Sequence, residues 1–182
     1  MSVNLTKGQR VSLKKPGGAA PTAIMLGLGW DTGRDQVDLD ASAVLLDAGK
    51  KVVDTVYFGH LKSNDGSVRH SGDNLTGEGD GDDEKIFVDL ARVPANVEQI
   101  VFTVNSYRGQ TFNVVKSAFV RVVDQSSGQE LCKFQLSEKY TRTALITGRL
   151  YRHNGEWKFA AIGAETDGRT AQQLASAIQA AV

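Results

Sequence analysis

The residues best suited to chemistry lie in one acidic, glycine-rich stretch, residues 72–84. Its six carboxylates have no basic side chain among them and belong to Asp73, Glu78, Asp80, Asp82, Asp83 and Glu84. Negative charge this dense is unfavourable unless water, salt or a cation neutralises it. Glycines at positions 77, 79 and 81 let the chain turn sharply and point its oxygens inward. Because Ca²⁺ takes about six to eight oxygen ligands, the stretch indicates a calcium-binding loop.

A solvated acidic loop or linker is the alternative for this stretch, and it is the usual explanation of an acidic run. The stretch lies in mid-chain between two apolar, strand-like segments, however, which argues against a disordered tail. An ordered loop with a bound cation is therefore the favoured interpretation.

A second acidic cluster precedes the first and contains Asp31, Asp35, Asp38 and Asp40. If Asp38 and Asp40 lie on a strand, both carboxylates project from one face and Leu39 from the other. Two neighbouring anions on one face are costly unless a positive charge lies between them. Taken alone, this cluster fits a hydrated surface strand equally well. Together with the loop at residues 72–84, it predicts a metal pocket that both segments share.

The elements that must position these residues are mostly short strands. Alternating or continuous apolar runs separated by turn residues predict about nine to eleven strands and no helix between them. The runs fall at residues 5–15, 23–30, 41–47, 52–58, 85–90, 97–104, 118–124, 130–136, 141–153 and 156–162. Asn154-Gly155 is the strongest hairpin signal. This pattern predicts a mainly β protein, an antiparallel β-sandwich.

The tail of the chain has a different periodicity. Leu174, Ala177, Ile178 and Ala181 recur at helical spacing, so we expect a C-terminal α-helix over about residues 168–181. Thr170 is a candidate N-cap for this helix. With 182 residues, the chain is expected to form a single domain, residues 1–182.

Composition excludes several classes of function. The formal net charge is zero, so nothing suggests nucleic acid as a partner. No apolar run approaches the ~18 residues of a membrane helix, and the N-terminus lacks the order of a signal peptide. The single cysteine, Cys132, rules out an internal disulfide and is compatible with a reducing cytosol. Its alternating surroundings predict a place in the core of a strand.

Other metal motifs fit poorly. An EF-hand loop that starts at Asp73 would have Glu78 where glycine is required. His60 and His70 flank a turn and could approach each other across a hairpin, but a zinc site needs more histidine or cysteine ligands than this segment offers.

Five motifs together give the chain a family resemblance: residues 27–31 (GLGWD), 38–42 (DLDAS), 62–67 (KSNDGS), 70–84 (HSGDNLTGEGDGDDE) and 151–159 (YRHNGEWKF). They resemble the TerD family of bacterial tellurium-resistance and general stress proteins. The likeness extends over residues 3–163, and residues 72–84 are its most specific part. It implies a calcium-binding, somewhat C2-like β-sandwich of the bacterial cytoplasm.

The resemblance also implies two adjacent calcium ions between the two acidic segments. The candidate ligands carried over to this chain are Asp31, Asp38, Asp40, Asp73, Asn74, Glu78, Asp80, Asp82, Asp83 and Glu84. We therefore expect a non-enzymatic stress-response protein, cytoplasmic or peripheral to the membrane. Its expected partners are calcium ions, together with other stress proteins or the inner membrane surface.

Two functions of other classes compete with this one. Clustered carboxylates could hold Mg²⁺ or Ca²⁺ in a metal-dependent hydrolase or phosphatase, although no convincing nucleophile or base accompanies them in the sequence. Reduction or binding of tellurite through Cys132 is the other, and it is discounted because one cysteine cannot cycle a dithiol.

Overall fold

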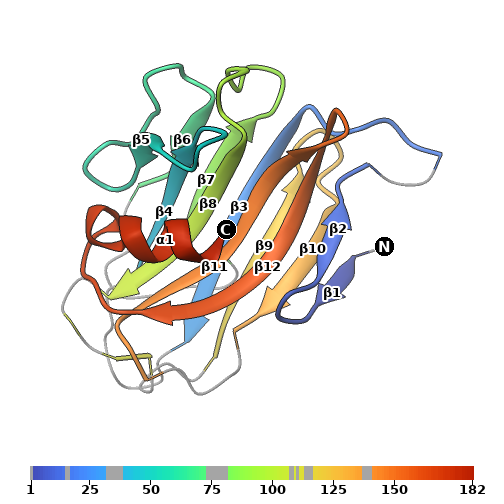
Figure 1. Cartoon of the computed structure of the whole chain (residues 1–182). Coiled ribbons are helices and arrows are strands. Elements are labelled where there is room, and N and C mark those ends of the chain that lie inside the picture. Colours follow the sequence, from blue (N-terminus) through green and yellow to red (C-terminus); the bar gives the residue numbers. More distant parts are fainter. Residues whose placement is uncertain are drawn as a thin grey trace.

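The computed structural model describes residues 2–14, 17–31, 39–72, 82–106, 109, 111–112, 117–136 and 141–182. These residues form two sheets of six strands each, packed face to face (Figure 1). Sheet A contains, in spatial order, β1 (Val3–Leu5), β10 (Glu130–Gln135), β9 (Ser117–Asp124), β3 (Ala23–Asp31), β7 (Glu84–Asp89) and β6 (Val68–His70). Sheet B contains β2 (Arg10–Ser12), β12 (Glu156–Thr166), β11 (Ala144–His153), β8 (Gln99–Ser106), β4 (Leu39–Leu46) and β5 (Val52–Val56).

Neighbouring strands are antiparallel, except that β1 runs parallel to β10. The predicted antiparallel sandwich is thus confirmed, with one parallel pair at an edge. The described residues form twelve strands, more than the about nine to eleven that periodicity predicts. The run at residues 5–15 takes in the last residue of β1 and the whole of β2, because a turn at Gly8 (φ 86°) carries the chain from sheet A to sheet B. The three residues of β6 are too few to show alternation.

Apolar side chains from both sheets fill the space between them. Along β7, Glu84, Ile86 and Val88 are buried while the residues between them are more accessible, as alternation at residues 85–90 predicts. Ile86 and Val88 belong to the same buried cluster as Phe102 of β8 and Phe159 of β12. The inward face of each sheet therefore forms one shared core.

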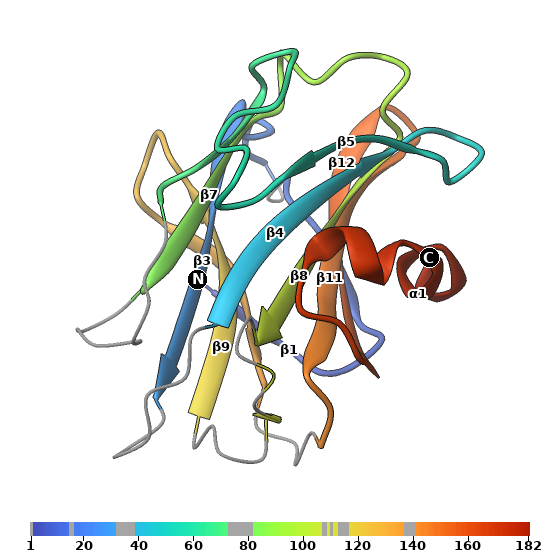
Figure 2. The same ribbon diagram turned by 90° about the vertical axis from the view of Figure 1, so that its left-hand side faces the viewer.

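The middle of sheet B is buried on both of its faces. Every residue of β4 and β8 is buried, so neither strand shows the alternation of a half-exposed strand. Figure 2 shows the reason: the C-terminal segment lies across the outer face of sheet B. Leu174 and Ile178 from this segment pack with Val44, Val101 and Ile146. Each such aliphatic side chain contributes about 1.5–3 kcal/mol when fully buried.

The C-terminal helix is shorter than predicted. A 3₁₀ turn, η2 (Ala171–Leu174), begins the segment, and only α1 (Ala175–Ala181) is α-helical. Thr170 occupies the N-cap position of η2, but its side chain makes no capping hydrogen bond. Instead the Arg169 N–H donates to Gln173 Oε1 at 2.8 Å. No helix of the described residues is long and apolar enough to cross a membrane.

One end of the sandwich gathers the strand termini that carry acidic residues (Figure 2). Strand β3 ends at Asp31, opposite the start of β9, while β7 begins at Glu84, opposite Leu28. Strand β4 also starts here and pairs with the last residues of β8. The name acidic end is used below for this part of the molecule, with Asp31, Asp40, Asp82, Asp83 and Glu84.

Candidate metal centre

The structure describes half of the predicted metal ligands, and all of these lie at the acidic end. Asp31 is exposed at the end of β3, whereas Asp40, the second residue of β4, is only 2% exposed. Asp82 and Asp83 are partly buried just before β7, and Glu84 begins that strand with 1% exposure. The other five predicted ligands lie outside the described residues: Asp38, Asp73, Asn74, Glu78 and Asp80.

Asp83 is fastened to the end of β3. Its Oδ2 accepts a hydrogen bond from the Trp30 N–H at 2.9 Å, and its own N–H donates to the Leu28 carbonyl at 2.7 Å. Trp30 immediately precedes Asp31. These two bonds therefore bring the end of the acidic stretch at residues 72–84 beside the start of the cluster that begins at Asp31, although Trp30 and Asp83 are 53 residues apart in the chain.

Glu84 joins the two sheets. Its Oε2 accepts a hydrogen bond at 2.7 Å from the N–H of Ala41, the residue that follows Asp40. His70 reinforces this junction, since its Nε2 lies 3.3 Å from Glu84 Oε2 and 3.1 Å from the Ala41 carbonyl oxygen. The His70 Nδ1 accepts from the Gly72 N–H at 2.9 Å, which leaves the proton on Nε2 to be donated.

Asp82 has an arginine partner within the protein. The Arg121 Nε and Nη2 donate to its two carboxylate oxygens at 2.9 and 2.6 Å, a forked geometry that is strong and directional. Hydrogen bonding to Asp82 is the main upward effect on the pKa of Arg121, and it outweighs the opposing effect of burial. Gly27 makes room for the pair, because a Cβ there would lie only 2.2 Å from Asp82 Oδ1.

Negative charge at the acidic end remains crowded despite these contacts. Burial, and in addition the neighbouring Asp82 carboxylate, raise the pKa of Asp83, while the hydrogen bond from Trp30 opposes them. A cation beside Asp83 would favour the charged carboxylate. Asp31, Asp40 and Asp83 offer only oxygen, the donor atom that Ca²⁺ and Mg²⁺ prefer.

The described residues do not complete a metal cage. Within them, no group of three or more histidine, cysteine, aspartate or glutamate side chains is arranged to hold an ion. The zinc site rejected from the sequence finds no support either, because His60 lies 3.4 Å from Asp54 while His70 contacts Glu84. Cys132 is a buried thiol in β10, as its alternating surroundings predict, and burial raises its pKa to about 12.

Sequence reasoning missed three residues that organise this end, namely Gly27, His70 as a partner of Glu84, and Arg121. A signal for Arg121 does exist: it is a single charged residue that interrupts the apolar run at residues 118–123. A basic side chain in such a strand needs a carboxylate partner. Which carboxylate it takes is not visible in the sequence, because Asp82 lies 39 residues away.

These observations define the class of protein: a two-sheet β-sandwich in which two acidic segments meet at one end. The sequence matches the TerD domain over residues 1–177, and the chain belongs to this family. The resemblance predicted from its motifs is thereby confirmed.

Named relatives that align with this chain over nearly its whole length agree with this assignment. "Tellurium resistance protein TerZ" of Serratia marcescens is 49% identical, with 99% of this chain and 98% of that protein aligned. "Stress response protein SCP2" of Bacillus subtilis (strain 168) is 44% identical, with 97% of this chain and 98% of that protein aligned. The crystal structure of a homologue of telluride resistance protein (TerD) from Streptomyces coelicolor A3(2) has a TM-score of 0.70 at 22% identity. It covers 85% of this chain and 95% of its own, and it supports the fold alone.

Proposed function

We propose that this protein is a non-enzymatic calcium-binding module of a bacterial stress response. One observation carries the proposal: the bonds from Trp30 to Asp83 and from Ala41 to Glu84 join two acidic segments at one end of the sandwich. Bringing like charges together is unfavourable in itself, so the arrangement is best explained by a cation that binds there. The names of the relatives TerZ and SCP2 supply the connection to tellurium resistance and stress.

We assign two roles to the five candidate ligands that the structure describes. Asp82 is neutralised by Arg121, and Glu84 is held by Ala41 and His70, so these two carboxylates position the loop. We assign Asp31, Asp40 and Asp83 as ligands because they lie where the two acidic segments meet, although each also has interactions within the protein. Five candidates outside the described residues complete the proposed set for two calcium ions: Asp38, Asp73, Asn74, Glu78 and Asp80.

Calcium suits this donor set better than magnesium does. Mg²⁺ requires a near-ideal octahedron at about 2.0–2.1 Å and gives up its water reluctantly, whereas Ca²⁺ accepts a larger, irregular oxygen cage. In the cytoplasm, where we place the protein, free calcium is scarce. Binding must therefore be tight or follow a transient rise, and the neutralised end would then present a changed surface to another stress protein or to the inner membrane.

Calcium titration at buffered free concentrations tests the proposal. The Asp40→Asn variant should bind calcium at least about tenfold more weakly, because it loses a charged ligand worth more than about 1.4 kcal/mol. Asp89→Asn is the control, because Asp89 lies at the opposite end of strand β7 from Glu84 and therefore away from the acidic end. Binding by Asp40→Asn equal to that of the parent would remove Asp40 from the site, and metal-dependent phosphoester hydrolysis by the parent would favour the hydrolase alternative.

A further inference from the structure

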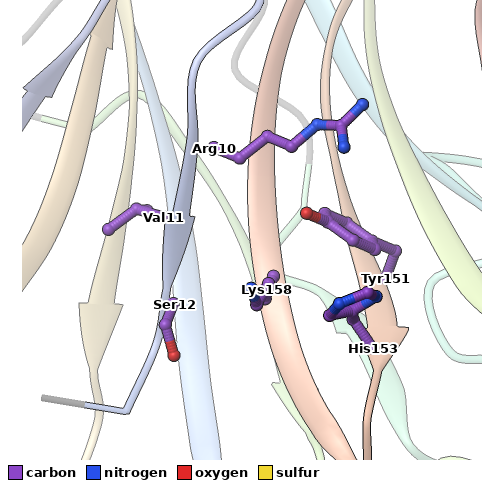
Figure 3. A pocket seen from close by; sticks show the side chains of 6 residues that line it. All are labelled: Arg10, Val11, Ser12, Tyr151, His153 and Lys158. Atoms are coloured by element: carbon purple, nitrogen blue, oxygen red, sulfur yellow. The ribbon is translucent and has the colours of Figure 1, made fainter.

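The outer face of sheet B is covered on one side and open on the other. The C-terminal segment covers β4, β8 and the beginning of β11 with apolar contacts. Where β2, β12 and the end of β11 lie side by side, the same face carries a pocket of about 150 Å³ (Figure 3). The residues that line it are Arg10, Val11, Ser12, Tyr151, His153 and Lys158.

The strand register places the basic side chains of this region on one face of sheet B. Arg10 pairs with Ala160, and Ala160 pairs in turn with Arg149, so these three side chains share one face in a row across three strands. In the adjacent row, Lys158 pairs with Ser12 on one side and with Tyr151 on the other.

Tyr151 holds both guanidinium groups beside the pocket. The Cζ of Arg149 lies 4.5 Å from the centre of the tyrosine ring, and the Cζ of Arg10 lies 5.9 Å from it. Cation–π contacts of this kind orient the guanidinium without neutralising its charge. The side-chain donors that surround the pocket are therefore partly ordered before any ligand arrives.

Positive charge in this pocket is not balanced by the protein. Among the described residues, no carboxylate lies within ion-pair distance of Arg10, Arg149 or Lys158. The Arg149 Nη1 donates instead to the neutral Gln99 Oε1 at 2.8 Å. Burial lowers the pKa of Arg149, and repulsion from Arg10 adds to the effect. The next carboxylate along β12 belongs to Glu156, and its Oε1 lies 4.0 Å from the Nζ of Lys14.

We propose that this pocket binds the phosphoryl group of a phosphate-bearing ligand, at a site separate from the acidic end. The Arg10 guanidinium can donate a pair of hydrogen bonds to phosphate oxygens, and the Lys158 ammonium adds a second charge, while Arg149 lies beside the pocket without lining it. A volume of about 150 Å³ equals roughly five waters of liquid volume, which is enough for one phosphoryl group. The group could come from a free phosphate compound or from a phospholipid headgroup.

Titration of the full chain in chelator, with inorganic phosphate and pyrophosphate as probes, tests the site without calcium. Arg10→Gln and Lys158→Gln should each weaken binding by about tenfold or more, because each removes a charge-assisted contact from the lining of the pocket. The matched control is Arg69→Gln in sheet A, whose guanidinium lies 4.4 Å from the Phe87 ring centre in a comparable stacked arrangement. It should bind like the parent.

Sedimentation with vesicles distinguishes the two sources. Binding to phosphatidylglycerol vesicles but not to phosphatidylcholine vesicles, lost in Arg10→Gln and Lys158→Gln, would identify a lipid headgroup. Binding of soluble phosphate alone would identify a free phosphate compound. The proposal is overturned if neither probe binds, or if Arg69→Gln weakens binding as much as the pocket variants do. Far-ultraviolet circular dichroism of each variant checks that it is folded.

Discussion

The acidic end and the basic pocket both concentrate charge of one sign, but the protein treats the two in opposite ways. At the acidic end, Asp82 has Arg121, and Glu84 has Ala41 and His70. In the basic pocket, among the described residues, neither Arg10 nor Lys158 has a carboxylate partner. Their internal partners indicate that Asp82 and Glu84 hold the fold together at the acidic end, whereas the unbalanced charges of Arg10 and Lys158 around a hollow indicate a ligand.

The largest effect should follow from removing Arg121. Its partner Asp82 has a side chain only 2% exposed, against 31% for Arg121. Arg121→Met would leave that carboxylate buried and unpaired, so the free energy of unfolding should fall by about 2–4 kcal/mol, somewhat less than for a fully buried pair. Urea denaturation measures this. In the double variant Arg121→Met/Asp82→Asn most of the loss should be recovered, and the absence of recovery would contradict the pairing.

A smaller loss is expected when the junction between the sheets loses its charge. Glu84→Gln keeps the shape of the side chain but weakens the acceptor for the Ala41 N–H and removes the charge beside His70. Hydrogen bonds to charged groups contribute about 1.5–3 kcal/mol, so a loss of about 1–2 kcal/mol is expected. Chemical denaturation again provides the measurement, and stability equal to that of the parent would show that the carboxylate charge has no role in the junction.

How much of the molecule could be predicted from the sequence depends on how local each interaction is. The hairpin at Asn154-Gly155 was predictable because its turn is encoded in two adjacent residues, and φ is positive at both. The meeting of the two acidic segments was also predictable from their composition. Which acid does what was not, because Asp82, Asp83 and Glu84 take partners that lie 39, 53 and 43 residues away.

The same reasoning applies to the fold. Alternation predicted β7 because one face of that strand is buried in the core and the other is partly accessible. It misjudged where the tail becomes helical, since η2 is set by packing of Ala171 and Leu174 onto sheet B rather than by a side-chain cap. Local patterns predict elements, whereas the partners of an element come from the tertiary structure.

In contrast to the acidic end, the region around the basic pocket should lose little stability when a charge is removed. Arg149→Gln removes a guanidinium that is repelled by Arg10 and has no carboxylate partner among the described residues. Arg149 is only partly buried, and relief of its repulsion by Arg10 offsets the lost contacts with Gln99 and Tyr151, so stability should change by at most about 0.5 kcal/mol. A denaturation curve is sufficient to check this. A loss above about 1 kcal/mol would mean that Arg149 serves the fold, and the contrast between the two regions would fail.

The smallest effect is expected at Cys132. Its sulfur is fully buried in β10, and burial raises its pKa to about 12, so it stays a neutral thiol at physiological pH. Because the thiolate is the nucleophile, native protein at pH 8 should not react with a thiol reagent such as Ellman's, whereas protein unfolded in denaturant should react fully. Rapid labelling of the native protein would revive the tellurite–thiol alternative.

The central claim is that the acidic end binds calcium, and thermal melting of metal-free protein with and without calcium tests it most directly. At free calcium about 100 times Kd, one site should add ~2.7 kcal/mol of stability. For a domain of this size, each kcal/mol raises the midpoint by roughly 2–4 °C, so calcium should raise it by about 5–10 °C per occupied site. The increment should shrink in Asp83→Asn and persist in Asp89→Asn. A metal-free parent protein whose midpoint does not change with calcium would contradict the account.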